Sequence, residues 1–253
     1  MNNRISRGQL LIISAPSGAG KTSLIRALIE NDRRIEVSVS HTTRPQRPGE
    51  LEGVNYFFVP PETFQTMQDD GAFFESAEVF GHGYGTSTAQ LDARLAQGAD
   101  VILEIDWQGA QQVRSILPDS AWIFILPPSV ASLKTRLRGR GQDTDATIDL
   151  RMQAAQDEMS HCYEADYLVI NDVFDTALIE LQAIISALRL RTGRQQAAHT
   201  ALLSDLLTSE TAKLRGMLAN LHSTVGSHAL ARVYYAAAFY RGVDQESMLS
   251  WPE

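Results

Sequence analysis

Cysteine, positive charge and long apolar runs are all scarce in this chain of 253 residues. It has one cysteine, Cys162, which excludes an internal disulfide, and we expect this thiol to be packed rather than reactive. The formal net charge of −8 argues against a general binder of nucleic acid or of membrane surfaces. No apolar run approaches the roughly 20 residues that a membrane-spanning helix needs. These features predict a cytoplasmic globular protein in which any anionic ligand is held by local groups of arginine.

Patterns typical of metal sites and of nucleophilic catalysis are missing from the sequence as well. His82 has no second histidine spaced to form a metal site with it. No Ser/His/Asp constellation is apparent, and there is no internal repeat. The function must therefore be sought in other motifs.

The segment 9–22, QLLIISAPSGAGKT, joins an apolar strand to a glycine-containing turn and a Lys-Thr pair, and a helical pattern follows. Gly18 and Gly20 let the backbone curl so that several N–H groups point at one anion. The helix that follows adds its positive end. Lys21 would reach the terminal phosphates of a nucleotide, and the Thr22 hydroxyl would bind Mg²⁺. The segment therefore predicts a polyphosphate-binding loop, and a loop that only connects two elements is the alternative.

Four apolar runs are typical of buried strands, at 10–13, 101–105, 122–126 and 167–170. Helical patterns lie at 107–117, 129–137, 144–162 and 175–191. Apolar strands that alternate with helices predict an α/β fold with a parallel sheet covered on both faces. Since ligands bind beyond the carboxyl ends of such strands, the phosphate loop, residues 104–106 and residues 171–172 should meet at one edge.

The stretch 37–88 departs from this rhythm, with short alternating segments at 37–40, 56–59 and 73–79 and many glycines. It predicts an inserted β-rich subdomain over the same edge of the sheet. Within it, the loop SHTTRPQRPGE holds Arg44 and Arg47 on a backbone stiffened by proline. Two such guanidinium groups suit a phosphate dianion. Alone the loop would be interpreted as solvated, but its place beside the phosphate loop favours a ligand.

Two further segments supply polar groups for the same edge. Glu75 follows two aromatic residues, and the turn GHGYGT carries Tyr84 and Thr86. A carboxylate, a hydroxyl and aromatic walls could frame a planar base that has N–H donors. Glu104 and Asp106 end a buried strand, where proteins with a phosphate loop keep the acid that positions Mg²⁺ and its water.

A basic segment, LKTRLRGRG at 133–141, leads into a glycine hinge and a polar stretch. It predicts a mobile lid over about residues 138–152, and Arg136, Arg140 and Arg151 could reach a transferring phosphoryl group. Positive charge at the end of a helix is the alternative explanation, but it does not require the glycines.

The chain resembles the bacterial guanylate kinases, a family of P-loop nucleoside monophosphate kinases, over about residues 8–207. The resemblance rests on SAPSGAGKT, SVSHTTRPQRPGE, GVNYFFV, EVFGHGYGTS, LEIDWQGA, FILPPS, RLRGRGQD and YLVINDVFDTA, in that order. Ala15 stands where the strict phosphate-loop pattern has glycine, which is normal in this family. The resemblance implies a three-layer P-loop NTPase fold with an inserted GMP-binding subdomain and a lid. It also implies phosphoryl transfer from MgATP to GMP, with dGMP as a further acceptor, in purine nucleotide metabolism.

The resemblance implies a role for each matching residue. The GMP phosphate would be held by Ser40, Arg44, Arg47, Tyr56 and Tyr84. The guanine edge would be read by Glu75 and Thr86, with Asp106 nearby and with Glu104 on either the base or the magnesium water shell. The moving phosphoryl charge would be stabilised by Lys21, Arg44, Arg136, Arg140 and Arg151. ATP would be bound by Ala15, Pro16, Ser17, Gly18, Ala19, Gly20, Lys21, Thr22 and Asn171, with Mg²⁺ on Thr22.

Residues 208–253 lie outside the resemblance, which assigns 1–207 to a guanylate kinase domain with an insertion at about 38–88. Two apolar stripes in 208–253 predict a helical extension of unknown role, packed on its own core or on a neighbouring subunit, and a partner-binding role is the alternative. A homo-oligomer is therefore left open.

Two rival functions remain at this point. Folds of this type also serve as non-catalytic peptide-binding modules, but those typically have degraded phosphate loops, whereas this chain keeps the inner glycines and the Lys-Thr pair. A kinase for another nucleoside monophosphate is disfavoured by Glu75. A carboxylate there accepts from the N1–H and exocyclic amine of guanine, and adenine offers neither pattern.

Overall fold

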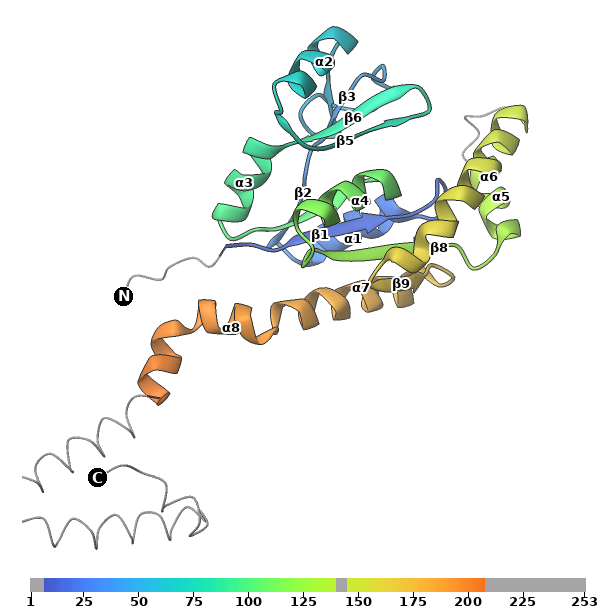
Figure 1. The fold of residues 1–253 in the computed structure, drawn as a ribbon. Coiled ribbons are helices and arrows are strands. Elements are labelled where there is room, and N and C mark those ends of the chain that lie inside the picture. Colours follow the sequence, from blue (N-terminus) through green and yellow to red (C-terminus); the bar gives the residue numbers. More distant parts are fainter. Residues whose placement is uncertain (1–6, 140–144, 208–253) are drawn as a thin grey trace, which may run out of the picture. The chain divides into compact units, whose positions relative to one another are not determined.

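The structure, a computed structural model, describes residues 7–139 and 145–207. In this part of the chain the core is a parallel sheet with the strand order β2-β7-β1-β8-β9 (Figure 1). Its strands are β1 (Leu10–Ser14), β2 (Ile35–Val37), β7 (Asp100–Glu104), β8 (Ala121–Leu126) and β9 (Tyr167–Ile170). The central strand β1 is buried along its whole length, as expected for an apolar run covered on both faces. The four strands predicted from the sequence are confirmed, with ends that differ by at most one residue.

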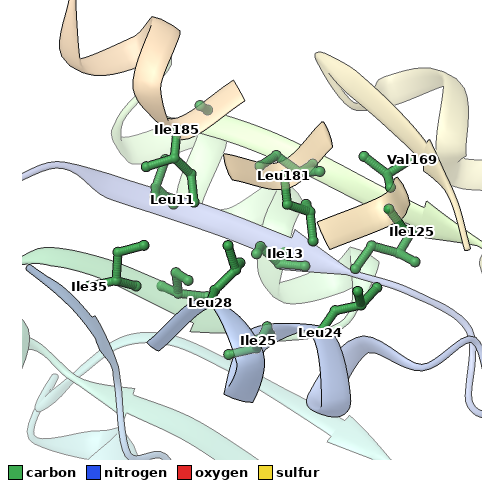
Figure 2. Packing of buried hydrophobic residues seen from close by; sticks show 14 of the residues in the cluster. Leu11, Ile13, Leu24, Ile25, Leu28, Ile35, Ile125, Val169, Leu181 and Ile185 are labelled. Atoms are coloured by element: carbon green, nitrogen blue, oxygen red, sulfur yellow. The ribbon is translucent and has the colours of Figure 1, made fainter. Parts of the chain in front are cut away.

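Helices cover both faces of the core sheet. One face packs against α1 (Lys21–Asn31) and α7 (Phe174–Arg189), and the other against α3 (Thr88–Ala96) and α4 (Trp107–Ile116). Figure 2 shows the first of these layers, in which Leu24 and Leu28 of α1 and Leu181 and Ile185 of α7 approach the strands. Burying a leucine or isoleucine side chain contributes roughly 1.5–3 kcal/mol, so these layers fix the strand ends that carry the site.

A second sheet in the described residues has the strand order β4-β3-β6-β5 and forms the predicted β-rich insertion (Figure 1). Its strands are β3 (His41–Thr42), β4 (Phe57–Phe58), β5 (Phe73–Val79) and β6 (His82–Ser87). The helix α2 (Pro61–Asp69) packs on it through Phe64, whose ring centroid lies 4.7 Å from that of Phe73. Two residues, Phe80 and Gly81, join β5 to β6, and both have positive φ, at 52° and 74°. A type I′ hairpin turn requires this backbone conformation.

One predicted strand of the insertion is wrong. The pattern at 37–40 favours a strand there, but the strand is β2, and it pairs in parallel with β7 in the core sheet. Ile35 is 2% exposed and Val37 packs against the same cluster, so their side chains draw this segment into the core. The helices α2 and α3 were also not predicted, because each is short and lies among glycine-rich segments.

The predicted lid, about residues 138–152, takes in the end of α5 (Val130–Gly139) and the first half of α6 (Asp145–Ser160). A short 3-10 helix at His161–Glu164 follows α6. The pattern at 144–162 therefore covers two elements rather than one. Buried side chains join the two helices in a small cluster made of Leu133, Leu137, Ile148 and Ala155. Residues 140–144, with Arg140 among them, lie outside the described residues.

The chain divides into two compact units after Arg194. The helix α8 (Thr192–Ala198) begins just before this division, and residues 200–207 are helical. The helices predicted at 208–253 lie outside the described residues. Among the helices that are described, none has the length and apolarity to cross a membrane.

A buried ionic cluster ties the end of α7 to the start of β7. Asp100 is 4% exposed, and its carboxylate accepts from Nε of Arg189 at 2.6 Å and from Nη2 of Arg194 at 3.2 Å. The backbone N–H of Gln9 donates to the same carboxylate at 3.0 Å. Arg189 also pairs with Asp32. The cluster connects three segments that are distant in the sequence.

Candidate functional site

The phosphate loop joins β1 to α1 and takes the conformation that its glycines permit. Gly18 and Gly20 have φ values of 93° and 96°, in the left-handed region. A Cβ on Gly20 would lie 2.3 Å from Nδ2 of Asn171, so this position has no room for a side chain. The helix α1 begins directly after Gly20 without a side-chain cap. Its positive end therefore faces the loop, as anion binding requires.

Asn171 and Arg136 support this loop through hydrogen bonds to its backbone. Nδ2 of Asn171 donates to the Ala19 carbonyl oxygen at 2.7 Å, and the Asn171 side chain is buried. Arg136 donates to the same oxygen at 3.3 Å and to the Asn171 carbonyl at 2.8 Å. These contacts make the two residues supports of the loop. Their contacts with adenine and with the transferring phosphoryl group stay predictions.

The Lys-Thr pair meets the carboxyl end of β7, as the rule for parallel sheets predicts. Nζ of Lys21 donates to the carbonyl oxygen of Ile105 at 3.1 Å, and Oγ1 of Thr22 donates to Oε1 of Glu104 at 2.6 Å. A hydroxyl and a carboxylate side by side are the oxygen ligands that Mg²⁺ prefers. Among the described residues, no cluster of His, Cys, Asp and Glu could hold a metal alone. A magnesium ion here would complete its shell with phosphate oxygens and water.

The two arginines of the proline-containing loop take different positions. Arg44 is 8% exposed, and it donates to Oε1 of Glu50 and to the Pro45 carbonyl, both at 2.7 Å. The backbone N–H of Arg47 donates to the other oxygen of Glu50 at 2.8 Å. Burial opposes the ionisation of Glu50, yet the Arg44 guanidinium lowers its pKa. Arg44 and Glu50 thus stiffen the loop, while Arg47 lines the cleft described below.

Tyr56 and Tyr84 lie beside Arg44. Their ring centroids lie 5.9 Å apart, and Cζ of Arg44 lies 5.3 Å from the centroid of Tyr56. Burial, with the negative charge of Glu104 adding to it, raises the pKa of Tyr56 to about 12. The phenol therefore keeps its proton at neutral pH and can donate to an anionic ligand.

Glu75 lies buried on β5, with 4% of its surface exposed. Its Oε1 accepts from Oγ1 of Thr86 at 2.5 Å. Burial raises the pKa of Glu75 to about 7, the nearby Asp106 adds to the increase, and the bond from Thr86 opposes it. Asp106 itself caps α4, since its Oδ1 accepts from the backbone N–H of Gly109 at 3.0 Å. A buried carboxylate of this kind suits a ligand that brings its own N–H donors.

An open cleft of about 260 Å³ brings most of these groups together. One wall consists of the phosphate-loop residues Ala15, Pro16, Ser17, Gly18, Gly20, Lys21 and Thr22. The facing wall contains Ser40, Arg47, Tyr56, Glu75 and Tyr84, and Glu104, Asp106 and Arg151 also line the cleft. The remaining predicted residues with described positions, Ala19, Arg44, Thr86, Arg136 and Asn171, are not among the lining residues. They contact lining residues or the loops that carry them.

Five lining residues are not among the predicted site residues: Ala77, Val79, Phe80, Ile105 and Glu158. Oε2 of Glu158, on α6, accepts from the backbone N–H of Ser17 in the phosphate loop at 3.1 Å. Burial raises the pKa of Glu158, and the Ser17 N–H and the charge of Lys21 oppose this. Phe80, at the positive-φ turn of the hairpin, also lines the cleft. An acid in a polar helix carries no local signal of such a contact, whereas the tight turn could have pointed to Phe80.

A family model described as guanylate kinase matches residues 7–188. The guanylate kinase of Legionella pneumophila (strain Lens) is 56% identical over 203 residues, which cover 80% of this chain and 97% of that protein. The guanylate kinase of Hahella chejuensis is 56% identical over 207 residues, which cover 82% and 100%. The crystal structure of guanylate kinase from Anaplasma phagocytophilum has a TM-score of 0.63 and 33% identity, covering 75% of this chain and 90% of that one. This chain therefore belongs to the guanylate kinase family.

Proposed function

We propose that this protein transfers the γ-phosphoryl group of ATP to GMP, giving ADP and GDP. The observation that carries this proposal is the single cleft whose walls are the phosphate loop and the surface around Glu75 and Arg47. Membership of the guanylate kinase family supports the same activity.

The phosphate loop binds the donor nucleotide. Backbone N–H groups at Gly18 to Gly20 and the positive end of α1 surround the phosphates of ATP. Lys21 leaves its contact with the Ile105 carbonyl and reaches the β- and γ-phosphates. Asn171 and Arg136 support the loop through their hydrogen bonds to the Ala19 carbonyl oxygen.

The second sheet binds the acceptor nucleotide. Ser40, Arg47, Tyr56 and Tyr84 line the part of the cleft where the GMP phosphate lies. Glu75 accepts from the N1–H and the exocyclic amine of guanine, and Thr86 fixes its carboxylate. A base without these donors leaves a buried acceptor unpaired, which can produce a discrimination of roughly 10⁴ to 10⁵.

The reaction needs no nucleophilic side chain. An oxygen of the GMP phosphate forms a bond to the γ-phosphorus while the bond to the bridging oxygen breaks and ADP leaves with that electron pair. The transition state is loose, so the protein acts by aligning the two nucleotides and by neutralising charge. Lys21, Arg136 and the lid residue Arg151 provide that charge, with Arg140 as a further member of the group.

Mg²⁺ is the cofactor in this proposal, with Thr22 and Glu104 as the residues that would hold it or its water. When bound, it neutralises charge on the β- and γ-phosphates. The donor set supports it, because a hydroxyl and a carboxylate lie 2.6 Å apart beside the phosphate loop.

A panel of acceptors tests the proposal. Purified protein is incubated with MgATP and with GMP, dGMP, AMP, CMP, UMP or IMP, and ADP formation is measured. We expect rapid turnover with GMP. If none of these acceptors supported ADP formation, a non-catalytic peptide-binding module would be favoured instead. A preference for AMP, CMP or UMP would show that the protein is a kinase for another nucleoside monophosphate.

We also propose dGMP as an acceptor, since the assigned contacts involve the base and the phosphate rather than the ribose hydroxyl groups.

The catalytic unit extends to about residue 207, with the insertion at about 38–88, the lid at about 138–152, and 208–253 as an extension. The protein works in the cytoplasm without binding nucleic acid, in keeping with its single cysteine and its net charge of −8. Cell fractionation tests the location, and light scattering decides between a monomer and a homo-oligomer.

A further inference from the structure

The first turn of α4 lies directly against the Glu75 carboxylate. A Cβ built on Gly109 would lie 2.6 Å from Oε2 of Glu75 and 3.2 Å from Cδ1 of Ile105. Contacts shorter than 3.0 Å are essentially never made by real Cβ atoms. The carboxylate of Glu75 therefore occupies the space that a side chain at position 109 would fill.

A second contact locks α4 to the strand that carries Glu75. Gln112 lies one turn after Gly109, on the same side of the helix. Its Oε1 accepts from the backbone N–H of Ser76 at 3.1 Å, and its Nε2 donates to the Ser76 carbonyl at 2.8 Å. Because β5 is at the edge of the second sheet, this amide takes the place of a neighbouring strand. The pair fixes the backbone next to Glu75 relative to Gly109.

The two oxygens of Glu75 are thus held from different sides. Oε1 accepts from Thr86 at 2.5 Å, and Oε2 lies against the backbone of Gly109. A carboxylate that reads guanine needs both oxygens in line with two donors, the N1–H and the exocyclic amine. Moving one oxygen while the other stays on Thr86 turns the carboxylate out of that line.

We propose that Gly109 is a positioning residue that sets the selectivity for guanine, by leaving the space in which Glu75 aligns both of its oxygens with the base. This inference rests on the proposed GMP kinase function and deepens it. Gly109 lies against Glu75 and is not among the residues that line the cleft, so it acts through that carboxylate.

A methyl group at position 109 is expected to change the site without disturbing the fold. The closest atom that it meets is the tip of a flexible side chain, which can turn away. Alanine also favours a helix more than glycine does. The cost of Gly109→Ala should therefore appear in recognition of the base rather than in stability.

The experiment compares kcat/KM for GMP and for IMP, which lacks the exocyclic amine, in the wild-type protein and in Gly109→Ala. We expect kcat/KM for GMP to fall on the order of 10- to 100-fold, mainly through KM, as for the loss of one hydrogen bond to a charged group. The value for IMP should fall less, so the preference for GMP over IMP decreases. The affinity for ATP should stay unchanged, and the thermal midpoint should be equal or higher.

Gly193→Ala is the matched control, because Gly193 lies in a helix and a Cβ there meets no described atom within 4 Å. It should leave both kcat/KM values unchanged. In a Glu75→Ala background, Gly109→Ala should have no further effect on the preference between GMP and IMP.

Three results would overturn the inference. The first is an unchanged preference in Gly109→Ala, and the second is an equal loss in the Glu75→Ala background. The third is an unfolded Gly109→Ala protein, since only a side-chain tip should have to move. A wild-type protein that forms no GDP would instead reject the proposed function itself, so the two failures can be told apart.

Discussion

Replacing Glu75 by glutamine should make the protein more stable at alkaline pH while it damages the use of GMP. The side chain is 4% exposed, and burial, with the charge of Asp106 adding to it, raises its pKa from the ordinary 4.5 to about 7. In the unfolded chain the carboxyl loses its proton near pH 4.5. Between these two pH values the folded protein binds more protons than the unfolded chain does.

The size of the effect follows from these two pKa values. Because the folded state binds the extra proton, the free energy of unfolding falls as the pH rises from 4.5 to 7. The contribution of Glu75 protonation to the free energy of unfolding is complete below pH 4.5 and is lost above pH 7. Each pH unit between these values lowers the free energy of unfolding by about 1.4 kcal/mol, so the total loss is about 3 kcal/mol. Glutamine cannot ionise, and its amide oxygen can still accept from Thr86.

Urea unfolding from pH 4.5 to pH 8.5 measures this difference. We expect the free energy of unfolding of Glu75→Gln, minus that of the wild type, to increase by about 3 kcal/mol across the range. Glu78→Gln, an exposed carboxylate on the same strand, should show no such increase. If the free energy of unfolding had the same pH dependence in Glu75→Gln and in the wild type, the reasoning would be refuted.

Glu75 also governs the use of GMP. In the wild-type protein the affinity for GMP should weaken below about pH 7, and Glu75→Gln should impair the use of GMP far more than the binding of ATP.

Four further predictions concern other parts of the molecule. Lys21→Met should keep the fold but lower kcat by orders of magnitude, and near-normal turnover would remove this lysine from the mechanism. Glu158→Ala should tighten ATP binding roughly five-fold, because the phosphates no longer compete with a carboxylate for a phosphate-loop N–H. Calorimetry with Asp157→Ala as the control tests this, and equal ATP affinities in both variants would contradict it. Asp100→Ala should destabilise the fold by about 3–5 kcal/mol in urea unfolding, since it leaves two arginines of a buried cluster without their shared carboxylate, and a loss below 1 kcal/mol would count against that role. Deletion of 210–253 should leave kcat unchanged, whereas a folded but inactive truncation would show that the extension completes the site.

Much of the fold could be predicted because its signals are local. The apolar runs of β1, β7, β8 and β9 indicate buried parallel strands, and the glycines with the Lys-Thr pair indicate a phosphate loop. Parallel strands end at the same edge, so the meeting of Thr22 with Glu104 also followed from sequence order. The strand β2 was misplaced because it has only three residues, and so short an alternation does not say which sheet it joins.

The amino-acid sequence by itself determined the class of fold, the phosphate loop and the set of residues that meet at the sheet edge, since each depends on neighbours along the chain. Only the tertiary structure decided that Glu158 reaches the N–H of Ser17, that Asn171 and Arg136 lie behind the loop, and that Gly109 makes room for Glu75. These contacts join residues that are distant in sequence. The local sequence does not distinguish the acids, amides and glycines that make such contacts from those that do not. Which of them meet depends on how whole helices and sheets pack, because a shift of one or two ångströms makes or breaks a hydrogen bond.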